Sequence, residues 1–330
     1  MKALALFSGG LDSALAIKVV QEQGIEVIAI NFVSHFFGGK NEKADNMAKQ
    51  LGVRLEYVDF SEIHTELVKN PPSGRGKNMN PCIDCHALMF EKAGELLEEY
   101  GANFLISGEV LGQRPMSQNF SALNRVKKLS GIDLGSLIVR PLSAKLLPIT
   151  KPEEEGWIDR EKLMDIQGRS RRRQLELVEE WGLVEYPTPS GGCMLTEPNY
   201  SKRLKVLEED GFLEDRYSFL FHLVKRGRFF RLEGGKYLFV GREKEDNYKI
   251  SEYKESGSLY IAGAGTPGPA IVGYGDLNEE QIRLAENLFS RYSQGKGKKK
   301  IQVLRNEKIV DVEEVDLEKL AEDIKKYLIL

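Results

Sequence analysis

The sequence has little of what marks secreted, membrane-spanning or strongly basic proteins. Its 330 residues include only three cysteines, and three thiols cannot build the disulfide framework of a small secreted protein. The formal net charge is only −3, so the chain as a whole is not a polyanion-binding protein of the histone kind. Any surface for nucleic acid must therefore be a local patch.

Long apolar runs are also missing near the start of the chain. The first run, residues 3–7, breaks at Gly9 and Gly10, which makes it too short for a signal peptide or a membrane span. We therefore expect a cytoplasmic protein. Its 41% hydrophobic and 29% charged residues are typical of a soluble globular chain, and its length suits two domains.

Continuous apolar runs alternate with helical patterns over the first half of the sequence. Such runs indicate strands that are buried on both faces of a parallel sheet. We therefore predict an α/β fold with a doubly wound parallel sheet, in a domain of residues 1–158. The expected strands are 2–7, 25–33, 53–59, 103–106 and 137–142, and the expected helices are 13–23, 42–51 and 83–100.

The second half divides into a helical segment and a smaller module. Residues 159–212 are predicted to form a helical subdomain that completes the active site, and residues 213–330 a C-terminal α+β module. The elements expected in that module are a hairpin at 229–240, strands at 258–262 and 270–274, a helix at 279–292, a connector at 294–300, an extended region at 301–312 and a helix at 317–328.

A glycine-rich turn separates the first expected strand from the first expected helix. Backbone N–H groups and the helix dipole at such a place bind anions, and adjacent glycines let the backbone approach phosphate oxygens. The absence of Gly-Lys-Ser/Thr excludes the common P-loop. The turn is predicted to bind phosphate groups, the alternative being a structural turn with a serine cap. Its residues are Ser8, Gly9, Gly10, Leu11, Asp12 and Ser13.

This Ser-Gly-Gly-Leu-Asp-Ser motif resembles the PP-loop of the ATP pyrophosphatase superfamily. The resemblance implies that ATP is cut between its α and β phosphates and that the substrate is adenylated. A carboxylate beside pyrophosphate is unfavourable alone, so Asp12 is expected to help hold Mg²⁺. Gly108, Glu109 and Arg140 follow later strands, and we expect them at the same sheet edge. Gly108 and Arg140 are predicted to bind the nucleotide, unless they are ordinary solvated loop residues.

The three cysteines, two of them in one Cys-x-x-Cys segment, indicate metal, cluster or thiol chemistry. Cys82 and Cys85 begin an expected helix, where thiolate is favoured, and Cys193 follows a flexible turn at 190–192. The count excludes a four-cysteine zinc site, and His86, the one candidate for a fourth ligand, is adjacent to Cys85, where two neighbouring residues rarely both reach one ion. Beside inert buried cysteines, two readings stay open: a 4Fe-4S cluster with one open iron, or a persulfide on Cys193 that Cys82 or Cys85 releases. Both make the three cysteines catalytic residues that deliver sulfur to an activated carbon.

The segments Asn-Pro-Cys-x-x-Cys at 80–85 and Ser-Gly-Gly-Cys at 190–193 resemble those of bacterial tRNA 2-thiouridylases, a similarity that covers roughly the first 210 residues. The resemblance implies thiolation of a tRNA uridine with ATP. Mg²⁺ is expected from Asp12, and a 4Fe-4S cluster is expected from the count of three thiols. The partners that the resemblance implies are tRNA and a sulfur donor, either sulfide or a persulfide carrier. The C-terminal module departs from that family, and its residues 240–247 are similar to NFACT-R RNA-binding domains.

Three basic clusters offer local surfaces for RNA. Such dense like charges repel unless a polyanion compensates them, although any one cluster can be a solvated face. In the second cluster, Phe229 and Phe230 are expected to stack on unpaired bases. The clusters are Arg169, Arg171, Arg172 and Arg173; Lys225, Arg226, Arg228 and Arg231; and Lys296, Lys298, Lys299 and Lys300.

Three functions can be compared on these features. In tRNA thiolation, the uridine carbonyl oxygen attacks the α phosphorus of ATP, and sulfur then displaces AMP. A second possibility is a PP-loop ligase that forms an amide or nitrile on a small molecule, and a third is a non-catalytic RNA-binding protein. Cysteines that are dispensable for activity would favour the second function, and absence of pyrophosphate release with any RNA would favour the third. We predict the first, an ATP-dependent tRNA sulfurtransferase.

Overall fold

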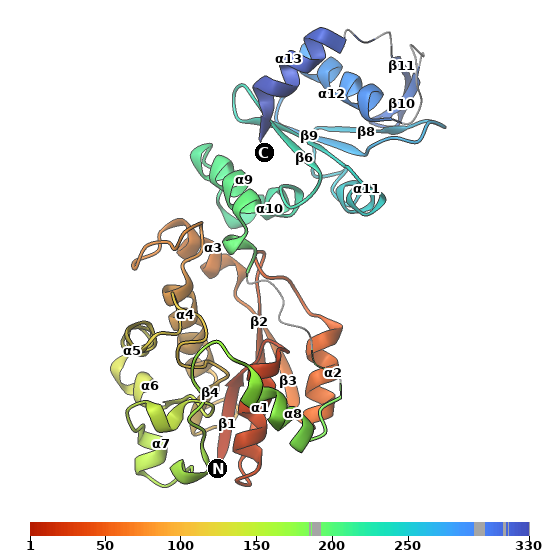
Figure 1. The fold of residues 1–330 in the computed structure, drawn as a ribbon. Coiled ribbons are helices and arrows are strands. Elements are labelled where there is room, and N and C mark those ends of the chain that lie inside the picture. The colour runs from red at the N-terminus through yellow and green to blue at the C-terminus, as the bar shows by residue number, and fades with distance from the viewer. Residues whose placement is uncertain (185, 187–192, 294–300, 313–314, 316, 330) are drawn as a thin grey trace. The chain divides into compact units, whose positions relative to one another are not determined.

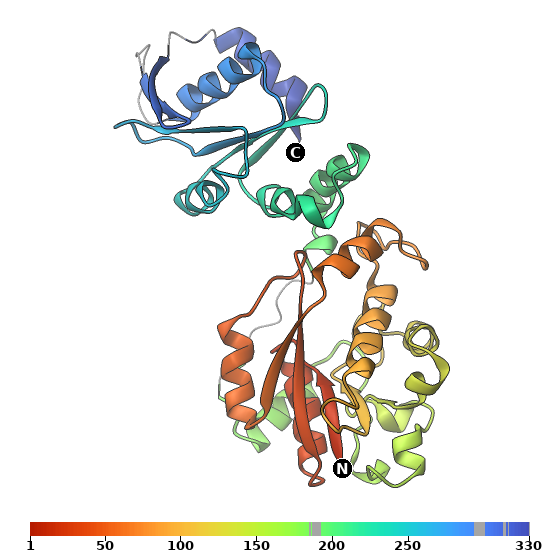
Figure 2. The ribbon, with the colours of Figure 1, turned by 180° about the vertical axis from the view of Figure 1, so that it is seen from behind.

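The computed structural model describes residues 1–184, 186, 193–293, 301–312, 315 and 317–329. The chain forms two compact units, Met1–Thr196 and Glu197–Leu330. Figures 1 and 2 show their elements from opposite sides. The boundary between the units falls inside residues 159–212, and the predicted division into three parts stays a prediction. In the described ranges, no helix is long and apolar enough to cross a bilayer.

The first unit is built on a sheet in which every neighbouring pair of strands is parallel, in the order β3-β2-β1-β4-β5. The strands are β1 Lys2–Leu6, β2 Glu26–Val33, β3 Arg54–Asp59, β4 Phe104–Ser107 and β5 Ile138–Val139. The strand order reverses between β1 and β4, and sheets of this kind bind ligands at the carboxyl ends of the strands at such a point. The predicted α/β fold is confirmed.

Helices cover both faces of this sheet (Figures 1 and 2). On one face lie α1 Leu11–Gln21, α2 Glu42–Leu51 and α8 Arg172–Glu180, and on the other α4 Cys82–Glu95 and α5 Phe120–Leu129. Alternate residues of β1 supply the two cores, because successive side chains of a strand point to opposite faces. Ala3 and Ala5 pack with the first group of helices, and Leu4 packs with the second. The sheet is therefore doubly wound, as predicted.

Several elements differ from the sequence prediction. No helix was predicted where α3 Ser61–Lys69, α5, α6 Ile132–Ser136 and α7 Lys151–Glu154 lie, and α4 ends before the predicted residue 100. The strand expected at 137–142 is reduced to the two residues of β5. Pro141 follows closely, and its ring nitrogen cannot donate a ladder hydrogen bond.

The second unit contains an antiparallel sheet in the order β11-β10-β8-β9-β7-β6-β12. The predicted hairpin around Gly234 and Gly235 is formed by β6 and β7, and the predicted α+β character is confirmed. The strands are β6 Arg228–Leu232, β7 Lys236–Val240, β8 Leu259–Gly263, β9 Ile271–Tyr274, β10 Ile301–Arg305, β11 Lys308–Val312 and β12 Leu328–Ile329. The helices are α9 Pro198–Glu209, α10 Ser218–Leu223, α11 Lys244–Ser251, α12 Glu279–Tyr292 and α13 Leu317–Tyr327.

The two faces of this second sheet pack differently. On one face, α12 and α13 contribute Leu288, Phe289 and Leu320 to an apolar core. On the other face the strands carry an aromatic cluster, in which the rings of Phe229 and Phe239 stack with centroids 5.3 Å apart. Both faces are therefore occupied by side chains of the unit itself.

Candidate functional site

The predicted phosphate loop lies between the end of β1 and the start of α1. Gly9 has a φ of +75°, and a Cβ atom there would lie 2.8 Å from Cα of Ala44 in α2. A side chain at this position would be strained by its backbone conformation and blocked by α2. Glycine is thus required here by backbone conformation and by packing, and the approach of a phosphate group stays a prediction.

The loop presents hydrogen-bond donors at the start of α1. Gly10 caps the helix without a side-chain hydrogen bond, and the geometry of a helix leaves the first-turn N–H groups without intrahelical acceptors. The Gly10 backbone nitrogen donates to Ser8 Oγ at 3.3 Å, and Ser13 Oγ donates to the Gly10 carbonyl at 2.8 Å. These hydroxyls hold the turn, and the N–H groups of Leu11, Asp12 and Ser13 are placed to receive an anion.

At the end of β4, Gly108 lies directly against this loop. A Cβ atom at Gly108 would lie 2.4 Å from the backbone nitrogen of Ser13 and 2.5 Å from the carbonyl carbon of Asp12. Any larger residue would displace the loop. Gly108 therefore does lie beside the phosphate loop, while its contact with a nucleotide stays a prediction.

The carboxylate of Asp12 is oriented by two side chains that sequence reasoning did not assign to the site. Asp12 Oδ2 accepts a hydrogen bond from Gln113 Nε2 at 2.6 Å and lies 3.4 Å from Arg171 Nη2. Gln174 Nε2 donates to Gln113 Oε1 at 3.1 Å, which fixes the amide. Asp12 Oδ1 is buried and has no hydrogen-bond partner among the described residues. That free oxygen fits the predicted Mg²⁺ ligand, because Mg²⁺ prefers carboxylate oxygens.

A buried ion pair follows Gly108. Glu109 Oε2 accepts hydrogen bonds from Arg140 Nε at 2.8 Å and from Ser107 Oγ at 3.1 Å, and Glu109 Oε1 accepts one from His86 Nδ1 at 2.8 Å. Burial raises the pKa of Glu109, but the Arg140 charge and His86 outweigh it and hold the pKa at about 2. Arg140 thus lies near the predicted sheet edge, but its guanidinium is committed to Glu109. Its predicted contact with the nucleotide stays a prediction.

The three thiols all belong to the first unit. Cys82 and Cys85 lie in the first turn of α4, where Cys82 Sγ accepts from Asn80 Nδ2 at 3.2 Å. Cys193 Sγ lies 3.8 Å from the carbonyl oxygen of Phe36. The turn at 190–192, which precedes Cys193, lies outside the described residues.

The thiolate expected at Cys85 is not favoured. Burial raises the pKa of the Cys85 thiol, and the charges of Cys193, Cys82 and Asp84 raise it further, so the dipole of α4 does not dominate. Cys82 and Cys193 both act on the Cys85 thiol in this way. Even so, the part of the chain that is described contains no group of three His, Cys, Asp or Glu side chains arranged to hold a metal ion. The placement of the thiols therefore does not fit a bound cluster as it stands.

Three arginines of the first basic cluster pair with acidic side chains of the protein. Arg172 Nε lies 3.2 Å from Glu176 Oε1, and Arg173 Nη1 lies 3.1 Å from Glu176 Oε2 and 2.9 Å from Glu180 Oε1. Arg172 and Arg173 thus have carboxylate partners one or two turns along α8, and the binding of RNA by this cluster stays a prediction. Arg171, in turn, faces Asp12.

The second cluster is also partly internal. Phe229 and Phe230 are fully buried, so the prediction that they stack on RNA bases is wrong. The Arg228 guanidinium lies 3.8 Å from the ring centroid of Tyr292, and Arg226 and Arg231 pair with acidic side chains. Successive side chains of a strand point to opposite faces, so Phe230 packs in the core beneath α12 and Phe229 packs in the aromatic cluster on the opposite face. The third cluster, Lys296, Lys298, Lys299 and Lys300, lies outside the described residues.

Two family models match separate parts of the chain. Residues 1–145 match the model described as Thiamine biosynthesis protein (ThiI), and residues 227–328 match that of the NFACT protein RNA binding domain. The first range contains the phosphate loop, Cys82 and Cys85, and the second contains the sheet of the second unit up to the start of β12.

Curated relatives carry names from tRNA thiolation. The "Probable tRNA sulfurtransferase" of Lysinibacillus sphaericus is 30% identical over 164 residues, which are 47% of this chain and 38% of the relative. The "tRNA-specific 2-thiouridylase MnmA" of Sulfurimonas denitrificans is 32% identical over 120 residues, 33% of this chain and 35% of the relative. The chain thus spans little more than a third of the length of either protein.

A solved structure described as a 4-thiouridine synthetase–RNA complex with bound ATP is 22% identical, covers 64% of this chain and 53% of its own, and has a TM-score of 0.36. At that score the overlap adds nothing to the strand order described above. The family models and the curated relatives nevertheless agree with the motifs. The resemblance read from the phosphate loop, the cysteine segments and residues 240–247 is confirmed: this chain is similar to ThiI and tRNA thiolation enzymes, and its C-terminal part to NFACT RNA-binding domains.

Proposed function

We propose that this protein is an ATP-dependent enzyme that thiolates a uridine of tRNA. One observation carries the proposal: the first unit holds both a glycine-rich turn at the N-terminus of α1 and all three cysteines, with Cys82 and Cys85 in the first turn of α4. The names of the relatives support sulfur transfer to tRNA. The match of residues 227–328 to an RNA-binding domain supports tRNA as the partner.

Adenylation uses the phosphate loop. The first-turn N–H groups of α1 bind phosphate oxygens of ATP, and the uridine carbonyl oxygen attacks the α phosphorus. The bond from the α phosphorus to the bridging oxygen breaks, and pyrophosphate leaves. Asp12 Oδ1 is the atom that would hold Mg²⁺, which supplies positive charge beside the pyrophosphate. Arg171 and Gln113 keep that carboxylate in place.

Sulfur transfer uses the cysteines, and one route runs through a persulfide on Cys193 that the sulfur donor supplies. Its terminal sulfur attacks the adenylated carbon, a carbon–sulfur bond forms, and AMP leaves. A thiolate of Cys82 or Cys85 then attacks the Cys193 sulfur and breaks the sulfur–sulfur bond. The products are thiouridine and a protein disulfide, which a thiol reductant must reduce before the next turnover.

The other route is a 4Fe-4S cluster on Cys82, Cys85 and Cys193, and the count of three thiols supports it, because such a cluster keeps one iron open for sulfide. The relay leaves one cysteine unexplained. Because the thiols as placed do not form a metal-holding group, we derive no step through the cluster.

Nucleoside mass spectrometry of tRNA from a deletion strain tests the proposed function. We expect one thiolated uridine to disappear and to return when the wild-type gene is restored. A complete set of thiolated nucleosides in the deletion strain would overturn the proposal. If the purified protein also released pyrophosphate without cysteines and with a small amine in place of tRNA, the PP-loop ligase function would replace it.

A further inference from the structure

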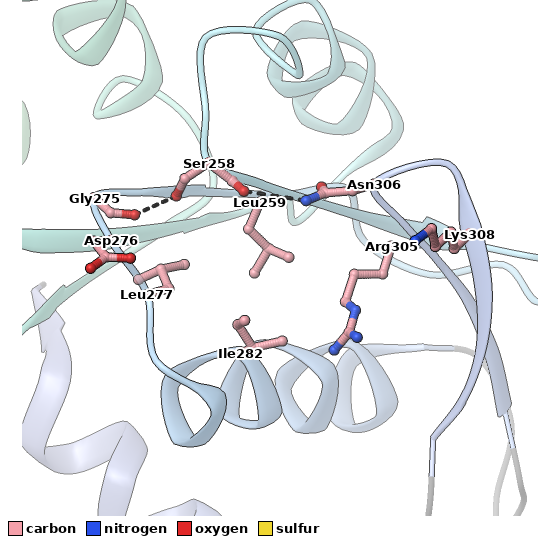
Figure 3. Close-up of a pocket in the computed structure, with 9 residues that line it drawn as sticks. All are labelled: Ser258, Leu259, Gly275, Asp276, Leu277, Ile282, Arg305, Asn306 and Lys308. Atoms are coloured by element: carbon pink, nitrogen blue, oxygen red, sulfur yellow. Dashed lines mark hydrogen bonds between the residues drawn. The ribbon is translucent and has the colours of Figure 1, made fainter.

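The second unit has a cavity that neither the proposed chemistry nor the basic clusters use. Its volume is about 340 Å³, and its lining comes from β8, the loop after β9, α12 and the β10–β11 hairpin (Figure 3). Ligand pockets in proteins span roughly 300–1,000 Å³, so this one suits a single small group or one residue of a polymer.

The middle of the cavity is apolar. Leu259 of β8, Leu277 of the loop after β9 and Ile282 of α12 point into it from different sides (Figure 3). All three belong to the core that α12 shares with the sheet or pack against it, so their positions are fixed. They offer a rigid apolar surface against which a flat ring can lie.

The two ends of the cavity carry opposite charges. Asp276 lies at one end, and Arg305 and Lys308 lie at the other (Figure 3). Arg305 Nη1 is held 3.2 Å from Glu286 Oε1. The side chains of Asp276 and Lys308 are exposed and have no hydrogen bond or ion pair with any residue that the structure describes. Both are therefore available to a ligand.

The walls are fixed before any ligand arrives. Asn306 Oδ1 accepts from the Tyr260 backbone nitrogen at 2.8 Å, and Asn306 Nδ2 donates to the Ser258 carbonyl at 3.3 Å, which ties the hairpin to β8. Asn306 and Glu307 have φ values of 44° and 68°, as the tight turn between β10 and β11 requires. Ser258 Oγ donates to the Gly275 carbonyl at 2.5 Å and holds the opposite wall.

We propose that this cavity binds one unpaired guanine nucleotide of an RNA. The base lies against Leu259, Leu277 and Ile282, and its N1–H and N2–H₂ groups donate to the two oxygens of Asp276. A backbone phosphate lies at Lys308, beside Arg305. Guanine is the base whose pairing edge offers two adjacent donors to a carboxylate. The inference rests on the proposed binding of RNA by the second unit.

Labelled pentanucleotides test the cavity on the full chain. UUGUU, UUAUU and a version with central inosine are titrated by fluorescence anisotropy, since inosine lacks only the N2 amine. We expect UUGUU to bind about tenfold more tightly than UUAUU, with inosine between them. Equal affinities for the three oligonucleotides would overturn the proposal.

Matched variants test the Asp276 end and the Lys308 end of the cavity separately. Asp276→Asn should abolish the preference for guanine, whereas Glu307→Gln, which removes the same charge outside the cavity, should keep it. Lys308→Ala should weaken all three oligonucleotides alike and reduce the salt dependence by about one phosphate contact. Lys254 is exposed and does not line the cavity, so Lys254→Ala should leave both the affinities and the salt dependence unchanged. A guanine preference that survives Asp276→Asn would exclude the assigned contact.

Thiolation is measured separately on the same preparations. If the wild-type protein thiolates tRNA but does not discriminate between the pentanucleotides, only the cavity assignment fails. If it prefers guanine but the deletion strain retains all thiolated nucleosides, the proposed function fails and the cavity assignment stands.

Discussion

At the scale of single residues, Asp12 depends on side chains that its motif does not contain. Arg171 reaches Asp12 across 159 positions of sequence, while its neighbour Arg172 is exposed and pairs with Glu176 on the surface of α8. These adjacent arginines thus have different partners. The partner of each arginine cannot be predicted from the run of arginines in the sequence, because the partner depends on which side of α8 faces the loop.

Replacing Arg171 with alanine is expected to lower pyrophosphate release by about tenfold or more, since Asp12 loses an orienting charge. Arg172→Ala should stay close to wild type, because exposed ion pairs contribute little. Asp12→Ala should abolish release while the fold is retained. Pyrophosphate release with ATP and tRNA measures all three. Equal losses in the two arginine variants would return both residues to an RNA-binding patch.

Gly108→Ala provides a second test at this scale. The added methyl group would lie 2.4 Å from the Ser13 nitrogen, so the loop must move. We expect a loss of about 1–3 kcal/mol in the free energy of unfolding and weakened ATP binding. Gly39→Ala is the control, because a Cβ atom there meets nothing within 4 Å. Urea unfolding and ATP titration measure the effects, and an ATP affinity unchanged by Gly108→Ala would contradict the placement of the loop.

At the scale of elements, Glu109 ties β4 to β5 through Arg140 and to α4 through His86. Its pKa falls from 4.5 to about 2 on folding. The stabilisation is therefore fully present above pH 4.5 and is lost as the pH falls through 2, and it amounts to roughly 3 kcal/mol. Because this ion pair is buried, removing either side chain would leave the other as an unpaired buried charge.

Glu109→Gln should consequently destabilise the first unit at pH 7 by about 3–5 kcal/mol, because Arg140 stays buried without its counter-charge. Its unfolding free energy should also fall less between pH 5 and pH 3 than that of the wild type. Urea unfolding at a series of pH values measures both effects. Parallel pH profiles for the two proteins would show that Glu109 is not the group that titrates.

The elements also show what the sequence could predict. The helix expected at 279–292 is observed with the same bounds, because Asn278 and Gln281 form a capping box before a clear apolar stripe. Helix α3 was missed, since Phe60 gives it no side-chain cap and its buried residues include His64 and Thr65. Local patterns predict elements with caps and stripes. They do not predict contacts between distant segments, such as Gln113 with Asp12.

At the scale of the whole molecule, the cluster and the persulfide relay predict different iron and sulfide contents for the purified protein. If the three thiols hold a cluster, anaerobically purified protein should be brown, with iron and acid-labile sulfide. Cys82→Ala, Cys85→Ala and Cys193→Ala should then each lose the colour and thiolation but retain adenylation, because cluster ligands act together. Iron and sulfide analysis and thiouridine formation measure this.

The persulfide relay predicts a different result. The protein should be colourless, a persulfide should be trapped on Cys193, and either Cys82 or Cys85 should tolerate replacement. Colourless, iron-free and fully active protein from an anaerobic preparation would exclude the cluster. The buried, protonated thiol of Cys85 makes Cys82 the better candidate for the releasing thiolate.

The packing of Gly9 against Ala44 restricts which residues two distant positions of the sequence can hold. Ala44 has no reactive group and lies in a helix outside the motif, yet its Cα is where a side chain at position 9 would have to go. Ala44 is itself fully buried, so a larger residue there would press on the loop backbone. Position 44 should therefore keep a small residue, and position 9 should keep glycine even where position 44 leaves room, because its φ of +75° disfavours any side chain.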